Sequence, residues 1–145
     1  MKVKIKPFVA YNLLLKGVIR KEELFREATK LLRYVVSQDA FPTGPVIYTT
    51  EKDGKYYVGV QVSDMVELHQ QENMRFYKEL KMEQCAFVRI YEEDALMKEA
   101  YQAIEEYVED HQYEMVSATR YHVVLDVYGS VITDLYVPIK RKESL

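Results

Sequence analysis

Side chains of the kinds that bind metals or act as nucleophiles are few in this sequence. The three histidines, His69, His111 and His122, lack the short spacing that places two metal ligands side by side. Cys85 lies in an apolar stretch with no neighbouring base, which predicts a buried, unreactive thiol. A single cysteine also excludes an internal disulfide and is typical of a reducing compartment. We therefore predict no metal site, no cofactor and no catalytic residue.

His122 is the sharpest polar candidate, because it lies in a predicted strand near the end of the chain. An imidazole can donate or accept a hydrogen bond to a ligand near neutral pH. The alternative interpretation is a histidine that is hydrogen-bonded within the sheet. Side chains alternate along a strand, so residues 122, 124 and 126 share one face. Asp126 is therefore a second candidate on that face.

Tyrosine is the unusual feature of the composition, with thirteen Tyr, five Phe and no Trp. A tyrosine ring has a broad apolar face and a hydroxyl, which suits pocket walls and stacking on flat or cationic ligands. Each tyrosine could instead be a half-buried sheet residue, and strand alternation lets only two or three of them face one pocket. Together with His122 and Asp126, the predicted ligand contacts are the tyrosines of the predicted central strands, Tyr11, Tyr48, Tyr57, Tyr121 and Tyr136.

Length and charge place the chain among single-domain globular proteins. Its 145 residues suffice for one core, and 30% of them are charged, with both signs interspersed and a net charge of −3. That balance provides no basic patch for direct contact with nucleic acid or an anionic membrane. No apolar run reaches the ~18 residues of a membrane span, and the N-terminus has no signal-peptide core. We therefore expect a cytoplasmic protein without direct nucleic-acid or membrane contacts.

Two similar halves supply the elements that position these residues. In the first half, residues 7–19 contain an apolar strand over 8–15 followed by a break at Lys16-Gly17, and an amphipathic helix of about 16 residues then starts near Leu24. A hairpin then joins strands 46–50 and 56–62 through Asp53 and Gly54, a strong turn signal. The second half repeats this order with a strand over 83–91, a helix capped by Asp94, and two strands within 121–139.

The last two strands meet at a predicted Gly129-Ser130 turn, and Pro138 with the basic tail is expected to stop the final one. We therefore predict an α+β fold: two β-α-β-β repeats with pseudo-twofold symmetry, a largely antiparallel sheet with two helices, and a cleft between the copies. The predicted ranges are 4–63 for the first repeat, 64–82 for a crossover, 83–139 for the second repeat and 140–145 for a basic tail. The crossover is expected to be a loop with a short helix, or an extended arm.

Short motifs in both halves resemble the GyrI-like effector-binding domains. They are residues 44–48 (GPVIY) with 57–62 (YVGVQV), and residues 120–123 (RYHV) with 134–139 (DLYVPI). The resemblance covers residues 4–139 and implies a tandem β-α-β-β fold with a ligand cleft, as in multidrug-responsive regulators, gyrase-inhibitory proteins and stand-alone binders. It also implies a cleft glutamate that meets cationic ligands. His122 stands at that position here, which weakens the case for drug-cation binding and for hydrolysis alike.

Three functions remain open at this stage. The leading one is a stand-alone module that binds a hydrophobic or aromatic small molecule, either neutral or cationic. Any regulation by this module would act through another protein. The second is a protein-interaction or inhibitory subunit with a vestigial cleft, and the apolar first strand would suit a homodimer or another protein partner. The third is hydrolysis of a small molecule, which needs a carboxylate and a tyrosine within hydrogen-bond reach, for example Asp126 with Tyr48 or Tyr136.

Overall fold

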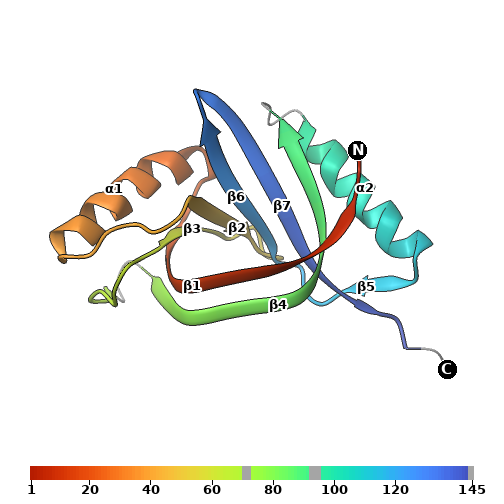
Figure 1. Ribbon diagram of the computed structural model, residues 1–145, viewed down its shortest axis with the longest axis horizontal. Helices are drawn as coiled ribbons and strands as arrows, with labels where there is room; N and C mark the ends of the chain where they lie inside the picture. Colours follow the sequence, from red (N-terminus) through yellow and green to blue (C-terminus); the bar gives the residue numbers. More distant parts are fainter. Residues whose placement is uncertain (70–72, 92–95, 144–145) are drawn as a thin grey trace. The chain divides into compact units, whose positions relative to one another are not determined.

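The computed structural model describes residues 1–69, 73–91 and 96–143 and divides the chain into two compact units (Figure 1). The α1 unit is Val9–Lys81, and the α2 unit combines Met1–Phe8 with Met82–Leu145. The elements in chain order are β1 (Lys4–Val18), η1 (Lys21–Glu23), α1 (Leu24–Ser37), β2 (Val46–Thr50), β3 (Tyr56–Gln61), β4 (Met74–Tyr91), α2 (Met97–Asp110), β5 (Tyr113–Met115), β6 (Arg120–Val127) and β7 (Ser130–Arg141). The long strands β1 and β4 therefore contribute residues to both units.

In the α1 unit, one helix covers an antiparallel sheet in which β3 lies between β1 and β2. The buried residues of α1 recur at three- and four-residue spacing, as an amphipathic helix requires: Leu24, Ala28, Leu31 and Val35. Leu31 and Val35 pack with Leu14 of β1 and Val60 of β3 in one apolar core. The hairpin between β2 and β3 turns at the predicted place, where Gly54 has a positive φ of 74°.

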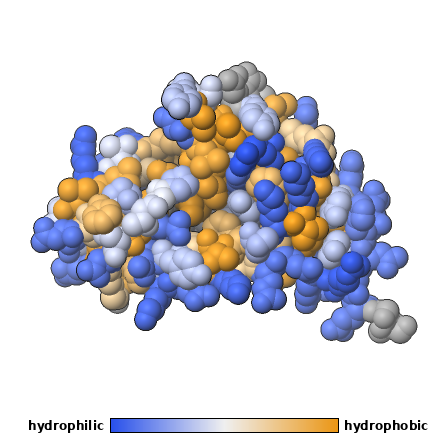
Figure 2. Space-filling view, viewed as in Figure 1, coloured by the Kyte–Doolittle hydropathy of each residue, from blue (hydrophilic) through white to orange (hydrophobic). Residues whose placement is uncertain are grey.

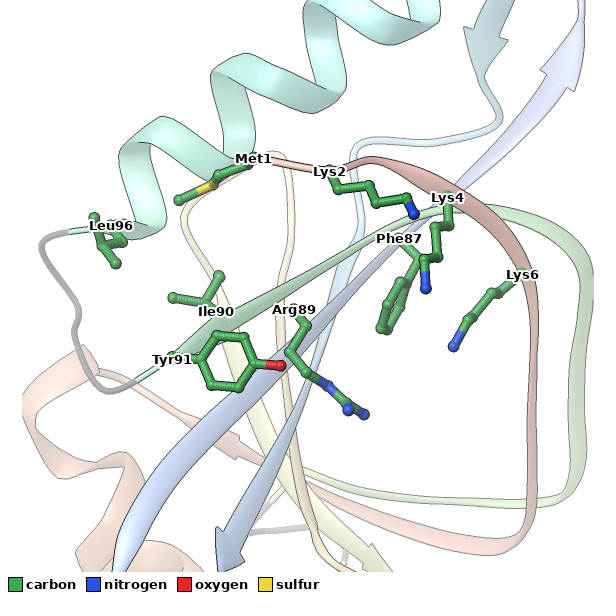
Figure 3. Close-up of a pocket in the computed structure, with 9 residues that line it drawn as sticks. All are labelled: Met1, Lys2, Lys4, Lys6, Phe87, Arg89, Ile90, Tyr91 and Leu96. Atoms are coloured by element: carbon green, nitrogen blue, oxygen red, sulfur yellow. The ribbon is translucent and has the colours of Figure 1, made fainter.

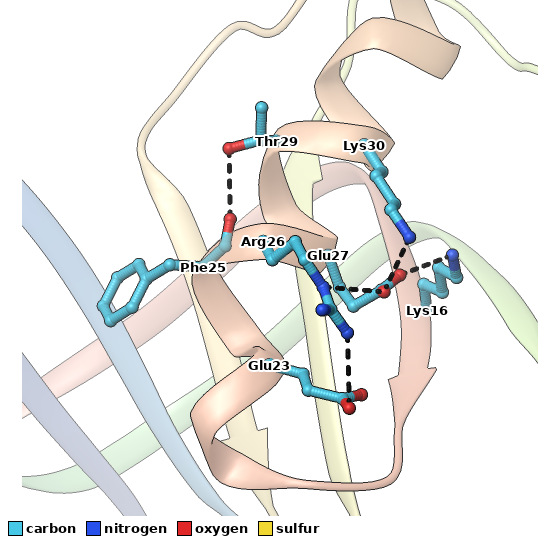
Figure 4. Close-up of polar contacts among 7 residues, drawn as sticks. All are labelled: Lys16, Glu23, Phe25, Arg26, Glu27, Thr29 and Lys30. Atoms are coloured by element: carbon cyan, nitrogen blue, oxygen red, sulfur yellow. Dashed lines mark hydrogen bonds and ion pairs between the residues drawn. The ribbon is translucent and has the colours of Figure 1, made fainter.

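Charged side chains connect the first turns of α1 to β1 (Figure 4). Glu27 accepts a hydrogen bond of 2.8 Å from Lys16 and a longer one of 3.3 Å from Lys30. Arg26 lies 3.3 Å from Glu23 in a pair one turn apart on the helix surface. The hydrogen bond from Lys16 is the main reason that the pKa of Glu27 lies below its usual value. The helix start is thus tied to the strand by charge as well as by apolar packing.

In the α2 unit, β7 is the central strand of an antiparallel sheet. It pairs with β4 on one side, with β6 on the other, and with the short β5 at its C-terminal end. The buried residues of α2 cover one face of this sheet and pack against Val88 and Leu135, and Val3 and Ile5 join the same core. The outer side of α2 carries mainly hydrophilic residues, as Figure 2 shows.

The α+β fold with one helix and antiparallel strands in each half agrees with the prediction, whereas several element boundaries differ. The strand predicted to begin at residue 83 starts at Met74, so the second part of the predicted crossover is extended chain. The predicted helix cap Asp94 lies outside the described residues. The final hairpin turns at Tyr128 and Gly129, with φ of 51° and 85°, rather than at Gly129 and Ser130, because a tight two-residue turn requires positive φ at both central residues.

The predicted stop at Pro138 was also wrong, since β7 continues to Arg141. A proline removes one N–H donor from a strand but keeps its carbonyl. The carbonyl of Pro138 accepts a hydrogen bond of 3.0 Å from the N–H of Val116, so pairing continues past the proline. The short strand β5, which the sequence pattern did not indicate, pairs with the extended end of β7.

Candidate ligand-binding site

Side-chain alternation gives the sheet of the α2 unit two different faces. Ala86 and Val88 of β4 and Leu135 of β7 point toward α2 and belong to its core. Their neighbours in sequence point the other way. In register, Tyr136 of β7 lies directly opposite Phe87 of β4 and also opposite Tyr121 of β6. One row of three aromatic residues therefore crosses three strands on the face opposite α2.

A fourth ring, from Phe8 of β1, completes this group. The Phe8 ring lies 5.2 Å from that of Tyr121 and 5.1 Å from that of Tyr136, and the Phe87 ring lies 5.0 Å from that of Tyr136. These centroid distances are in the range of favourable tilted and edge-to-face contacts. Phe8 and Phe87 are buried, whereas Tyr121 and Tyr136 are half-buried. We call the four residues the aromatic face.

An ion pair lies beside the aromatic face. Asp134 of β7 accepts two parallel hydrogen bonds from Arg89 of β4, Nε to Oδ1 at 2.7 Å and Nη2 to Oδ2 at 2.8 Å. The Asp134 side chain is 7% exposed and that of Arg89 is 43% exposed. These hydrogen bonds raise the pKa of Arg89, so the guanidinium keeps its charge. Burial, and secondly the charge of Asp134, raise the pKa of the nearby Tyr136 hydroxyl.

A row of lysines from the N-terminal stretch continues the same side of the unit. Lys2, Lys4 and Lys6 alternate with Val3 and Ile5, which pack into the α2 core, so the lysine side chains leave the chain on the other side. The Lys6 ammonium lies 4.3 Å from the centroid of the Phe87 ring, in cation–π geometry.

A cavity of about 450 Å³ lies between this lysine row and β4. Figure 3 shows the lysines coming from the N-terminal stretch, Phe87, Arg89 and Tyr91 from β4, and Leu96 from the start of α2. Met1 and Ile90 also line it. Phe87 belongs to the aromatic face, Arg89 belongs to the ion pair, and both line this cavity. The cavity is therefore continuous with the aromatic face and the ion pair.

His122 lies on the other side of the sheet from Tyr121. It is fully buried, and its Nε2 lies 2.7 Å from the hydroxyl of Tyr101, a residue of α2. The guanidinium of Arg120 covers the Tyr101 ring at 4.0 Å. Because neighbouring residues of a strand point to opposite faces, a ligand on the aromatic face contacts Tyr121 but not His122.

Asp126 is exposed and lies next to the hairpin turn. Its Oδ1 accepts a hydrogen bond of 3.1 Å from the N–H of Gly129, which stabilises the turn. In the β6–β7 register Asp126 pairs with Val131, whereas Tyr136 pairs with Tyr121. Five residues of strand separate the two positions, or about 16 Å at ~3.3 Å per residue. Asp126 and Tyr136 are thus too far apart to form the acid–base pair that hydrolysis would need.

The remaining predicted tyrosines belong to the α1 unit. Tyr57 is fully buried, and its hydroxyl accepts hydrogen bonds of 2.6 Å from Arg75 and 3.1 Å from Asn73. Tyr48 is also buried and lies opposite Val58 in the β2–β3 register. Tyr11 is 58% exposed, and its backbone N–H donates to the side chain of Gln61 at 2.8 Å. Of the seven predicted ligand contacts, Tyr121 and Tyr136 are the pair that meets on one face of the α2 unit.

Two further properties bear on the kind of site. Within residues 1–69, 73–91 and 96–143, no group of three or more His, Cys, Asp or Glu side chains is placed to hold a metal ion. Over the same ranges, no helix is long and apolar enough to cross a membrane. Cys85 is fully buried, and burial raises the pKa of its thiol to about 11, as expected for an unreactive cysteine.

The α+β fold of this chain resembles that of GyrI-like domains, and solved structures confirm this resemblance at the level of the fold. The chain is similar to the C-terminal domain of EcmrR, with a TM-score of 0.73 and 12% identity over 97% of this chain and 98% of that one. It is also similar to SAV2435, solved bound to tetraphenylphosphonium, with a TM-score of 0.54 and 12% identity over 97% and 94% of the two chains. A hydrolase from Listeria innocua matches with a TM-score of 0.56 and 8% identity over 93% and 92%.

Sequence comparison adds nothing to these structural matches. No protein-family model matches the chain, and no curated protein matches it significantly. At identities of 8–12%, the shared feature is the fold. Any ligand of this chain must therefore be inferred from its own residues.

Proposed function

We propose that this chain is a small-molecule-binding domain that holds a hydrophobic, aromatic ligand against the aromatic face of the α2 unit. The observation that supports the proposal is the group of four rings, joined by centroid distances of 5.0–5.2 Å, on the sheet face opposite α2. Ligand sites are mostly apolar and aromatic, with a few polar groups that orient the ligand. The hydroxyls of Tyr121 and Tyr136 and the Arg89–Asp134 pair would be those groups.

The neighbouring folds are compatible with this role. SAV2435 was solved with tetraphenylphosphonium, a ligand that carries four phenyl rings. In the present chain, the fully buried His122 is hydrogen-bonded to Tyr101 and Asp126 supports a turn, so neither is assigned to the ligand. We assign no catalytic role, and any regulatory effect of the bound ligand would be exerted through a partner protein.

A neutral fluorescent probe, N-phenyl-1-naphthylamine, tests the proposal on the full chain. We expect the dye to gain fluorescence with saturable binding, and Tyr121→Ala and Tyr136→Leu each to weaken its Kd about three- to tenfold through loss of aromatic contact. Tyr128→Asn is the matched control, because Tyr128 is a fully exposed tyrosine at a positive-φ turn position where asparagine is well tolerated. Its Kd should not change.

Circular dichroism and a thermal melt establish that each variant is folded before binding is compared. Absence of saturable binding to the wild-type chain would overturn the proposal. Equal binding to the folded Tyr121→Ala and Tyr136→Leu variants would overturn it as well, because it would place the dye elsewhere.

A further inference from the structure

Among the described residues, the charged side chains that line the cavity of the α2 unit are all positive. They are Lys2, Lys4, Lys6 and Arg89. The carboxylate of Asp134, the partner of Arg89, is already bound by two nitrogens of that guanidinium. Counting Asp134 with the four cations leaves three uncompensated positive charges among the described residues of the site.

The lysine ammonium groups of this row repel one another, and a bound anion would reduce that repulsion. Alternate residues of a strand lie about 7 Å apart, which is within the Debye length of about 8 Å at physiological ionic strength. Salt therefore screens the repulsion between the lysine ammonium groups only in part. An anionic group in the cavity would be attracted by all three lysines, and ammonium groups are strong donors to carboxylate and phosphate oxygens.

Aromatic surface lies next to these charges. The Lys6 ammonium already lies over the ring of Phe87, which also contacts the Tyr136 ring of the aromatic face. A ligand with a flat ring system and one acidic group could place the rings on the aromatic face and the acid toward the lysine row. The cavity of about 450 Å³ is of the size found for small-molecule sites.

We propose that the ligand of this site is an aromatic anion, with a carboxylate, sulfonate or phosphate group held by Lys2, Lys4 and Lys6. This inference rests on the proposed function and specifies the charge of its ligand. It assigns the lysine row as the specificity-determining residues. A cationic aromatic compound would be disfavoured, because Asp134, the buried carboxylate that the described residues place beside the aromatic face, already has Arg89 as its partner.

Two dyes that differ only in a sulfonate test the charge preference. The first, 8-anilinonaphthalene-1-sulfonate, is the anionic counterpart of neutral N-phenyl-1-naphthylamine. We expect the wild-type chain to bind the anion about ten- to a hundredfold more tightly at low salt, as for one charge-assisted contact. The preference should shrink when salt is raised to about 0.5 M, since screening then acts over about 4 Å. The full chain is used, so the charges of residues 92–95 contribute to the measured ratio.

Variants assign the preference to the lysine row. Lys4→Gln and Lys6→Gln should each lower the affinity ratio of the two dyes about threefold or more. Lys140→Gln is the control, because Lys140 is an exposed lysine of the same unit whose partner is Glu114. Because the anionic dye also binds partly unfolded chains, each variant is first shown to melt cooperatively. Tetraphenylphosphonium supplies the cationic arm and should compete poorly with the anionic dye.

The outcomes separate the two proposals. If neither dye binds saturably to the wild type, the proposed function itself fails. If the neutral dye binds and the sulfonate brings no gain, or the gain survives in the double variant Lys4→Gln/Lys6→Gln, the aromatic-anion inference is overturned while the binding domain stands. Tighter binding of tetraphenylphosphonium than of the anionic dye would also overturn it.

Discussion

Removing Arg89 should destabilise the protein more than removing the charge of its partner Asp134. The pair is asymmetric, because the Asp134 side chain is 7% exposed and the Arg89 side chain is 43% exposed. Arg89→Met leaves a carboxylate buried without its guanidinium, whereas Asp134→Asn leaves an arginine that can turn into solvent. The cost therefore depends on which partner is lost.

The expected magnitudes follow from the geometry. Opposite charges about 4 Å apart attract by ~4 kcal/mol at an effective dielectric constant of ~20. Because Arg89 is more than a third exposed, solvent screening reduces the net value of the pair to about 1–2 kcal/mol, between exposed and buried pairs. We expect Arg89→Met to lower the free energy of unfolding by about 2–3 kcal/mol, including the desolvated carboxylate, and Asp134→Asn by about 1 kcal/mol.

Urea unfolding of wild type and variants at neutral pH measures these differences. Lys140→Met is the matched control, since Lys140 forms an exposed pair with Glu114 at 3.5 Å and should cost about 0–0.5 kcal/mol. The reasoning would be refuted if Asp134→Asn cost as much as Arg89→Met.

Three further predictions concern the α1 unit and the lone thiol. Gly59→Ala should lower the free energy of unfolding by about 3 kcal/mol or more, because the added Cβ would lie 2.0 Å from a backbone oxygen of β1. Gly54→Ala places its Cβ in open space and should lower it by only about 1–2 kcal/mol, because an alanine is strained at this positive φ. The midpoints of urea unfolding compare the two variants. Acidification through the depressed pKa of Glu27 should remove the stability that its ion pair with Lys16 confers. In Glu27→Gln, the free energy of unfolding should therefore fall less steeply below about pH 5. The same pH dependence in wild type and variant would show that this pair does not contribute to stability. Cys85 should react with a thiol reagent only in urea, and prompt labelling in native buffer would contradict its burial.

The sequence predicted the elements that depend on local pattern. The period of the apolar residues in α1 and α2 reflects the turn of a helix, and the pair Asp53-Gly54 reflects the backbone requirement of a tight hairpin. Boundaries failed where a partner strand decides them. The strand β7 continues past Pro138 because the carbonyl of Pro138 accepts a hydrogen bond from Val116, which follows the partner strand β5. The presence of a proline in the sequence does not indicate that partner.

The site was harder to predict because its residues come from distant parts of the chain. Arg89 and Asp134 are separated by 45 residues and meet only through the register of β4 and β7. Tyr121 and His122 were both predicted as ligand contacts, and alternation dictates that they face opposite ways. Which of them faces α2 depends on how the sheet docks on that helix. The lysine row was visible as alternation in residues 2–6, but its aromatic neighbour was not.

The α2 unit combines Met1–Phe8 with Met82–Leu145, two segments that are far apart in the sequence. During synthesis Val3 and Ile5 emerge well before Val137 and Ile139, which belong to the core that they join. Closing so long a loop is slow, so this N-terminal strand must wait unpaired. Its alternating lysines are the kind of residue that keeps an unpaired strand from joining another chain. The charges that we assign to ligand selection would thus also protect the newly made protein from aggregation.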